Sequence, residues 1–289
     1  MTPSVGTRWH SPRSRGYAPA TKKDLHVFRG CGGSFLERFV QTFFHSTFQV
    51  EYSHMNIFII CGYGIPKDIA SDQNYSTYLN IVFNRMYERS ANQKAVVMSC
   101  GGPTKCDLPY DGTEAEVISD YLVSLMQRPE TVGQTKEWGV MLEDESLSTL
   151  ENLLFAKKLL DDQGVVGEIT IFCEKTRQAR VEAFADAVFD QKVFVDVVDF
   201  DISKNRYLDP DVINTKEALA LKEGLWTLEE SERLEKHHEF FQKKLAFLRR
   251  RQTEGLSHVD AVKEWFENQE SVMRELMPDH PLLADLGDS

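Results

Sequence analysis

Short apolar runs alternate with stretches of helical periodicity between Met55 and Phe200. The apolar runs are rich in Val, Ile and Phe and predict buried strands at 56–61, 94–100, 138–143, 168–173 and 192–200. The stretches between them predict helices at 75–90, 114–126, 148–162 and 176–189. Strands that alternate with helices form right-handed β-α-β units. We therefore expect residues 55–202 to form a Rossmann-like three-layer α/β/α sandwich with a mainly parallel five-stranded sheet.

The pattern after Phe200 is helical only. Two or three helices are predicted. They include one from about Leu228 to Arg251, with Leu234, Phe241, Leu245 and Leu248 on one face, and another at 258–276. These apolar faces need a cover. We expect residues 203–289 to form a helical C-terminal extension that packs on the α/β domain or on a partner, which includes a homo-oligomer formed through these helices.

Residues 1–54 differ from the rest of the chain. They contain Arg, Ser and Pro, have no acidic residue before Asp24, and lack the apolar core of a secretory signal. We expect a disordered N-terminal extension, with the folded unit starting at Met55. A mitochondrial transit peptide and an upstream extension of the gene model are the alternatives. The expected compartment is accordingly the cytoplasm, with mitochondria as the alternative.

Charge and composition exclude several classes of protein. The net charge is −12, although the first 50 residues carry seven Lys/Arg against two Asp/Glu. An acidic body repels a phosphate backbone, so we expect no nucleic-acid partner. No run approaches the ~20 apolar residues of a membrane span, so we expect no integral membrane span. The five cysteines contain no C-x-x-C pair, which favours reduced thiols and gives no metal site.

Histidine placement limits the chemistry of the predicted domain. None of the eight histidines lies between residues 55 and 236. A Ser-His-Asp triad or a His-ligated metal in that domain would therefore need a residue from an appended segment.

The segments that follow the predicted strands are the expected place for a ligand, because ligands bind at the carboxyl ends of parallel strands. The first, CGYGIPKD (61–68), begins like a dinucleotide fingerprint with Gly62 and Gly64 but lacks the third glycine. The second, SCGGPTKCD (99–107), contains Gly101 and Gly102. Glycines allow close approach of a ligand to the backbone, and they also serve tight turns, so both interpretations stay open.

The third segment, EDESLSTLEN (143–152), is unusually polar. Ser148 and Glu151 have the spacing of a capping box. Capping does not require the remaining polar side chains, which are Glu143, Ser146, Thr149 and Asn152. Thr149 and Asn152 share one side of the first helical turn, next to free backbone N–H groups, and would suit an anionic or polar ligand group. We expect the segment to serve as both a cap and a pocket wall.

The fourth segment, CEKTRQAR (173–180), places Lys175, Arg177 and Arg180 at the start of a helix, where cations oppose the dipole. Either a bound anion or ion pairs to Glu143, Glu145 or Glu151 would offset this. Three cysteines, Cys61, Cys100 and Cys173, end predicted strands, so we expect them to lie reduced at one edge of the sheet, around the mouth of the pocket. Cys100 is a candidate catalytic thiol, without an imidazole base in the predicted domain to activate it.

Together these segments resemble the domain-of-unknown-function 218 family, whose bacterial members include the SanA, ElyC and YdcF proteins. The resemblance covers about residues 55–190. It is carried by the glycines after the first two strands, by Glu114, and by the pattern Leu142, Glu143, Ser146, Thr149, Glu151 and Asn152. This chain has Cys100 where the family has Ser, and Arg177 where it usually has His. The resemblance implies a Rossmann-like fold and, from one branch of the family, S-adenosylmethionine binding.

The sequence thus predicts a domain that binds a small anionic or nucleotide-like ligand, either S-adenosylmethionine-like or phosphorylated. The predicted ligand-binding residues are Gly62, Gly64, Gly101, Gly102, Glu143, Ser146, Thr149, Asn152, Arg177 and Arg180. One alternative is a hydrolase or transferase of a phosphorylated substrate, with Glu114 or Glu143 as general base and a divalent metal ion as a potential cofactor. Another is a non-enzymatic assembly module.

Overall fold

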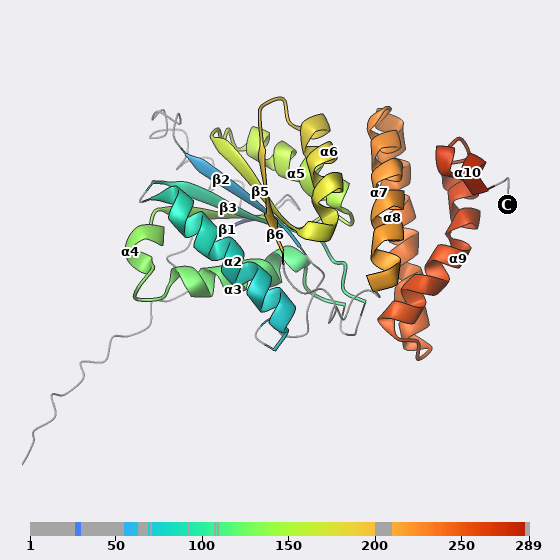
Figure 1. Ribbon diagram of the computed structural model, residues 1–289, viewed down its shortest axis with the longest axis horizontal. Coiled ribbons are helices and arrows are strands. Elements are labelled where there is room, and N and C mark those ends of the chain that lie inside the picture. The colour runs from blue at the N-terminus through green and yellow to red at the C-terminus, as the bar shows by residue number, and fades with distance from the viewer. Residues whose placement is uncertain are drawn as a thin grey trace, which may run out of the picture.

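The computed structural model describes residues 27–29, 55–62, 69, 71–91, 93–106, 108, 110–199 and 210–286. Its centre is a six-stranded, entirely parallel sheet in the order β1-β4-β3-β2-β5-β6 (Figure 1). The strands are β1 (Val27–Arg29), β2 (Asn56–Cys61), β3 (Ala95–Cys100), β4 (Trp138–Glu143), β5 (Glu168–Glu174) and β6 (Phe194–Val198). All five predicted strands are present.

Helices cover both faces of the sheet, so the predicted three-layer Rossmann-like fold is confirmed. On one face, α2 (Gln73–Ser90) and α3 (Glu114–Met126) enclose a core that includes Phe58 and Ile60 of β2. On the other face, α5 (Thr149–Asp162) and α6 (Gln178–Val188) enclose Ile57 and Ile59 of the same strand. Two short elements, α4 (Val132–Thr135) and the 3-10 turn η2 (Lys175–Arg177), were not separately predicted.

The strand β1 differs from the prediction of a disordered segment before Met55. Val27–Arg29 pairs in parallel with Val140–Leu142 of β4 and so extends the sheet by one strand. Three residues give too short an apolar run to stand out in a sequence pattern, because tertiary pairing decides whether such a run becomes a strand. The rest of residues 1–54 lies outside the described part of the chain.

The register brings the predicted strand ends to one edge. Cys61 is the partner of Cys100, Cys100 is the partner of Glu143, and Cys173 follows Phe172, the partner of Ile60. The three cysteines are buried and free, and their predicted location at one edge of the sheet is confirmed. The chain builds β2, β3 and β4 outward and then returns to the other side of β2, which makes this edge a topological switch point.

Four helices follow the sheet: α7 (Pro210–Leu228), α8 (Ser231–Thr253), α9 (His258–Leu276) and α10 (Pro281–Leu286). They share a third apolar core and pack on the α6 side of the domain (Figure 1). Gly224 of α7 approaches the Phe184 ring so closely that an added Cβ would lie 2.3 Å from it. Arg249 of α8 donates to the carbonyl oxygens of Pro103 and Lys105, at 2.5 and 2.9 Å. The extension thereby covers the carboxyl edge of the sheet.

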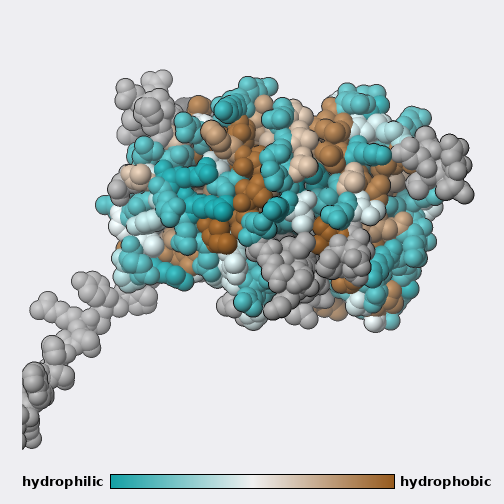
Figure 2. All heavy atoms as spheres, viewed as in Figure 1, coloured by the Kyte–Doolittle hydropathy of each residue, from teal (hydrophilic) through white to brown (hydrophobic). Residues whose placement is uncertain are grey.

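Hydrophobic side chains gather over the middle of the face shown in Figure 2, where β6 forms an edge of the sheet. Phe194 of β6 is half exposed. A homo-oligomer through the C-terminal helices stays a prediction. Of the helices that the structure describes, none combines the length and the apolar character needed to cross a membrane.

Candidate functional site

A cavity of about 240 Å³ lies between the strand ends and the helices α7, α8 and α9. Its walls include seven of the ten predicted ligand-binding residues, which are Gly62, Gly101, Ser146, Thr149, Asn152, Arg177 and Arg180. Gly102 and Glu143 are not among the lining residues, and Gly64 lies outside the described residues. The opposite wall, which includes Lys216, Glu217 and Lys244, comes from the extension.

The amides of Gly101 and Gly102 are hydrogen-bonded within the protein. Gly101 N donates to the Glu143 carbonyl oxygen at 2.9 Å, and Gly102 N donates to the Ser146 carbonyl oxygen at 2.8 Å. A Cβ on Gly102 would lie 2.4 Å from that same Ser146 oxygen. These glycines therefore permit close backbone contact between two loops, which a sequence pattern cannot distinguish from close contact with a ligand.

Glu114, a candidate general base, lies at the cavity wall beside the glycines. It is in the first turn of α3, whose capping box is formed by Thr113 and Glu116. Its carboxylate accepts a hydrogen bond from the Tyr75 hydroxyl at 3.1 Å. The side chain occupies the space that a Cβ on Gly62 would need, since that atom would lie 2.0 Å from the Glu114 carboxyl carbon. Glu114 thus packs against Gly62 as well as lining the cavity.

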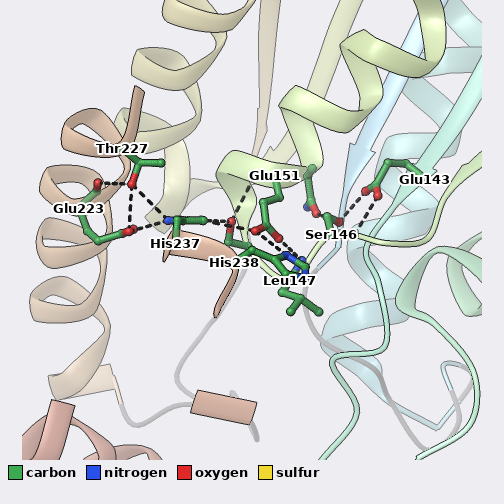
Figure 3. Close-up of polar contacts among 10 residues, drawn as sticks. Glu143, Ser146, Leu147, Glu151, Glu223, Thr227, His237 and His238 are labelled. Atoms are coloured by element: carbon green, nitrogen blue, oxygen red, sulfur yellow. Dashed lines mark hydrogen bonds and ion pairs between the residues drawn. The ribbon is translucent and has the colours of Figure 1, made fainter. Parts of the chain in front are cut away.

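Glu143, the other candidate base, holds its own loop together. Its Oε1 accepts hydrogen bonds from the amides of Glu145 and Ser146, at 3.0 and 2.9 Å. Its Oε2 lies 2.5 Å from Ser146 Oγ, which is also 2.5 Å from Asn152 Oδ1 (Figure 3). Burial raises the pKa of Glu143 to about 7, against the hydrogen bonds from Ser146. Because one hydroxyl proton cannot serve two acceptors, a protonated Glu143 donating to Ser146 completes this chain.

The cap at the start of α5 is formed largely as predicted. Ser148 Oγ accepts from the Glu151 amide at 3.1 Å. The Glu151 carboxylate accepts from the Leu147 amide at 2.6 Å, one residue before the expected position, and also contacts His238 Nδ1 at 3.0 Å. Two of the three glutamates of this segment, Glu143 and Glu151, are therefore used in local structure.

Ser148 also contacts a histidine from the extension. Its Oγ lies 2.7 Å from His237 Nε2, and His237 Nδ1 lies 2.5 Å from Glu223 Oε1. Figure 3 shows His237 between Glu223 and Thr227 of α7 on one side and the start of α5 on the other. His237 was not predicted at this site, because 89 residues separate it from Ser148. The only signal in the sequence was that no histidine lies between residues 55 and 236. An imidazole at the strand ends therefore had to come from an appended segment.

The two arginines pair with carboxylates outside the 143–151 loop. Arg177 Nε lies 3.1 Å from Glu174, and its guanidinium also donates to the Gly62 carbonyl oxygen. Arg180 Nε lies 2.7 Å from Glu217 but is poorly aligned for a hydrogen bond with it. Burial lowers the pKa of Arg180, against the attraction of Glu217. The sequence predicted that either a bound anion or ion pairs to Glu143, Glu145 or Glu151 would balance these cations. In the described residues, neither arginine forms an ion pair with those three glutamates.

The extension adds two lysines to the cavity. Burial lowers the pKa of Lys216 to about 7, against the attraction of Glu217, whose Oε1 is 3.5 Å from Lys216 Nζ. Burial and Arg180 lower the pKa of Lys244 to about 8. Lys244 Nζ lies over the rings of Phe241 and Phe266, 5.3 and 5.8 Å from their centroids. No carboxylate among the described residues lies within ion-pair distance of Lys244.

The thiols are poorly suited to catalysis. Burial raises the pKa of Cys100 well above its ordinary value, as it raises the pKa of Cys61 to about 11. None of the three cysteines Cys61, Cys100 and Cys173 lines the cavity, in contrast to the position expected around its mouth. A thiolate is the reactive species, so burial disfavours Cys100 as a nucleophile. In the described part of the chain, no three His, Cys, Asp or Glu side chains are grouped closely enough to hold a metal ion.

Searches of protein-family models, of curated proteins and of solved structures found no match to this chain.

Replacing the cap serine should separate its local role from its contact with His237. Ser148→Ala should lower the free energy of unfolding by about 0.5–2 kcal/mol, as lost N-caps do. Ser148→Asn should lose only a few tenths of a kcal/mol, because Asn caps about as well as Ser. Urea unfolding of both variants measures this. Equal losses would mean that the His237 contact, and not the cap, carries the stabilisation.

Proposed function

We propose that this protein binds a small anionic ligand in the cavity between the strand ends and the C-terminal helices. The observation that carries the proposal is the charge of the cavity wall in an acidic protein. Five cationic side chains line it, Lys105, Arg177, Arg180, Lys216 and Lys244, against the three carboxylates Glu114, Glu174 and Glu217. The chain as a whole has a net charge of −12.

The state of the lysines supports an anion as the occupant. An ammonium group that loses hydration without gaining a full partner has a lowered pKa. Lys216 shares Glu217 with Arg180, and Lys244 has ring contacts but no ion pair with a carboxylate of the described residues. A bound phosphate or carboxylate would supply the missing negative charge through charge-assisted hydrogen bonds.

Of the two ligand classes expected from the sequence, this wall favours the phosphorylated one. S-adenosylmethionine carries a sulfonium and an ammonium charge against one carboxylate, so its net charge is positive. Placing it beside excess cations would cost energy. The relationship to the domain-of-unknown-function 218 family stays a proposal, and the anion site does not depend on it.

A binding experiment with inorganic phosphate and pyrophosphate tests the proposal. We expect saturable binding by isothermal titration calorimetry, with pyrophosphate the tighter ligand. Lys244→Met should weaken it about 10- to 100-fold, the effect of removing one charge-assisted hydrogen bond. Lys243→Met is the matched control, because Lys243 is the neighbouring residue on α8 and pairs instead with Glu275 at 2.7 Å. The absence of saturable binding by the wild type, or equal affinities of both variants, would contradict the proposal.

A further inference from the structure

Ser148, His237 and Glu223 form a linear array at the cavity. Ser148 lines the cavity, and its Oγ is 2.7 Å from His237 Nε2. On the far side of the ring, Nδ1 is 2.5 Å from Glu223 Oε1. His237 is 1% exposed and Glu223 is 5% exposed, so both are held away from water. Three separate elements, α5, α8 and α7, supply the three residues.

Helix capping does not account for this array. Ser148 needs only its contact with the Glu151 amide to cap α5. Ser257 provides the comparison within the same chain, since its Oγ caps α9 by accepting from the Asp260 amide at 3.1 Å. The other side-chain contact of Ser257 is with Asp260 Oδ2, not with an imidazole. The buried imidazole and carboxylate behind Ser148 are therefore additional to the cap.

We propose that Ser148 is a nucleophile activated by His237, with Glu223 as the positioning residue, and that the cavity hydrolyses esters of small anionic acyl compounds. The order of contacts, hydroxyl to Nε2 and Nδ1 to carboxylate, is that of a serine hydrolase triad. The proposal takes its substrate class from the proposed anion site but takes its chemistry from different residues. The cations on the extension wall would hold the anionic end of the substrate while its ester carbonyl meets Ser148.

The reaction balances with water as the only co-reactant. Ser148 Oγ attacks the ester carbonyl carbon while neutral His237 Nε2 accepts the hydroxyl proton. The bond from that carbon to the alcohol oxygen then breaks, and His237 gives the proton to the departing alcohol. Water next attacks the acyl-Ser148 ester and transfers a proton to His237. The bond to Ser148 Oγ breaks, His237 returns the proton to Oγ, and the carboxylic acid leaves.

The start of α5 supplies the donors that such a reaction needs. Thr149 and Leu150 occupy the first turn after Ser148. Among the described residues, none accepts a hydrogen bond from either of their backbone N–H groups. Free first-turn amides and the positive end of a helix stabilise a developing oxyanion.

The charges around His237 determine the expected pH dependence. Glu223 of α7 lies at one ring nitrogen, and Glu151 of α5 lies 4.0 Å from the other. The neighbouring hydroxyls of Ser148 and Thr227 and the Phe241 ring complete its surroundings. Burial lowers the pKa of His237, but the two carboxylates outweigh it, so the pKa lies above the ordinary value. Because only neutral imidazole acts as the base, activity should rise on the alkaline side of neutrality.

Two probes test the serine and the substrate class separately. Diisopropyl fluorophosphate is neutral and phosphorylates activated serines with loss of fluoride. We expect one adduct by intact-protein mass spectrometry, mapped to Ser148. Hydrolysis of p-nitrophenyl acetate is then compared with that of the monoanionic p-nitrophenyl hydrogen succinate. We expect kcat/KM to be at least 10-fold higher for the succinate ester.

Variants assign the roles. Ser148→Asn keeps the cap and should abolish labelling, and Ser257→Ala should label as the wild type does. His237→Gln should slow labelling at least 100-fold. Glu223→Gln should slow it less and move the pH midpoint downward, because His237 loses a carboxylate, whereas a merely structural role would leave the midpoint unchanged.

Three results would overturn the triad. They are no adduct and no ester hydrolysis between pH 6 and 9.5 in protein that still binds pyrophosphate, an adduct on another residue, and an unchanged labelling rate in His237→Gln. Labelling of Ser148 without preference for the anionic ester would instead retain the triad and contradict the anion site.

Discussion

Replacing Lys244 with methionine should raise the free energy of unfolding of the ligand-free protein at pH 7 by about 1–3 kcal/mol. The reason is that the folded protein holds this ammonium group in a poorly hydrated place, where burial and Arg180 lower its pKa from 10.5 to about 8. The full shift corresponds to about 3 kcal/mol, and partial solvent screening and the lost ring contacts reduce it. Methionine has a similar length and no charge to desolvate.

The sign of the pH dependence follows from proton binding. Between pH 8 and about 10.5 the unfolded chain holds the Lys244 proton and the folded protein does not, so stability rises with pH over this window. The advantage of Lys244→Met should therefore be complete below pH 8 and lost above about pH 10.5. Urea unfolding at pH 7 and pH 10.5 measures it.

The ligand should reverse this order of stabilities. Saturating pyrophosphate at pH 7 should stabilise the wild type more than Lys244→Met, because a ligand that binds only the folded state adds to stability according to its affinity. Lys243→Met is again the control, since the Lys243 ammonium pairs with Glu275 at the surface. A Lys244→Met protein that is less stable than the wild type at pH 7 would show that the ammonium group already has an adequate partner.

The sequence predicted the parallel sheet well because its strands are buried on both faces. The runs NIFIIC and WGVMLE form β2 and β4 with the predicted limits. A continuous apolar run predicts a central strand, because such a strand is buried on both faces. The predicted helix at 176–189 begins instead with Gln178, because Lys175–Arg177 forms a separate 3-10 turn and helix ends depend on local capping contacts.

Only one of the two walls of the candidate site could be predicted from the sequence. Its strand-end wall follows from topology, which places Ser146, Thr149 and Arg180 at one edge once the strand order is known. Its second wall comes from α7 and α8. Lys216, Lys244 and His237 reach the cavity through packing of the extension, and nothing in the helical periodicity states which face meets the sheet edge.

The roles of Glu143 and the glycines show the same limit at the level of single atoms. Glu143 was predicted to bind ligand because its type and place suit that role. The structure uses it to accept two amides and face Ser146 instead. A carboxylate that accepts hydrogen bonds from its own loop and a carboxylate that binds a ligand cannot be distinguished in a single sequence. Both appear as an acidic residue directly after a strand.

The packing of Glu114 on Gly62 allows a sharp test of the strand-end geometry. Gly62→Ala should lower the free energy of unfolding by about 2–3 kcal/mol, because the new methyl group would need space that Glu114 fills. The added Cβ would lie 2.0 Å from the Glu114 carboxyl carbon and 2.6 Å from its Cγ. Glu114→Ala alone should also destabilise the protein, by loss of the Tyr75 contact.

The double variant Gly62→Ala/Glu114→Ala should be about 1–2 kcal/mol more stable than the sum of the two single effects predicts. The reason is that Glu114→Ala removes the side-chain atoms with which the new methyl group at position 62 would clash. Gly102→Ala is the matched control. Its clash is with the Ser146 backbone oxygen, 2.4 Å from the added Cβ, and Glu114→Ala cannot relieve it. Urea unfolding of the single and double variants measures both cycles. Additive effects in the Gly62 cycle, or equal coupling in the Gly102 cycle, would mean that Glu114 does not occupy the space beside Gly62.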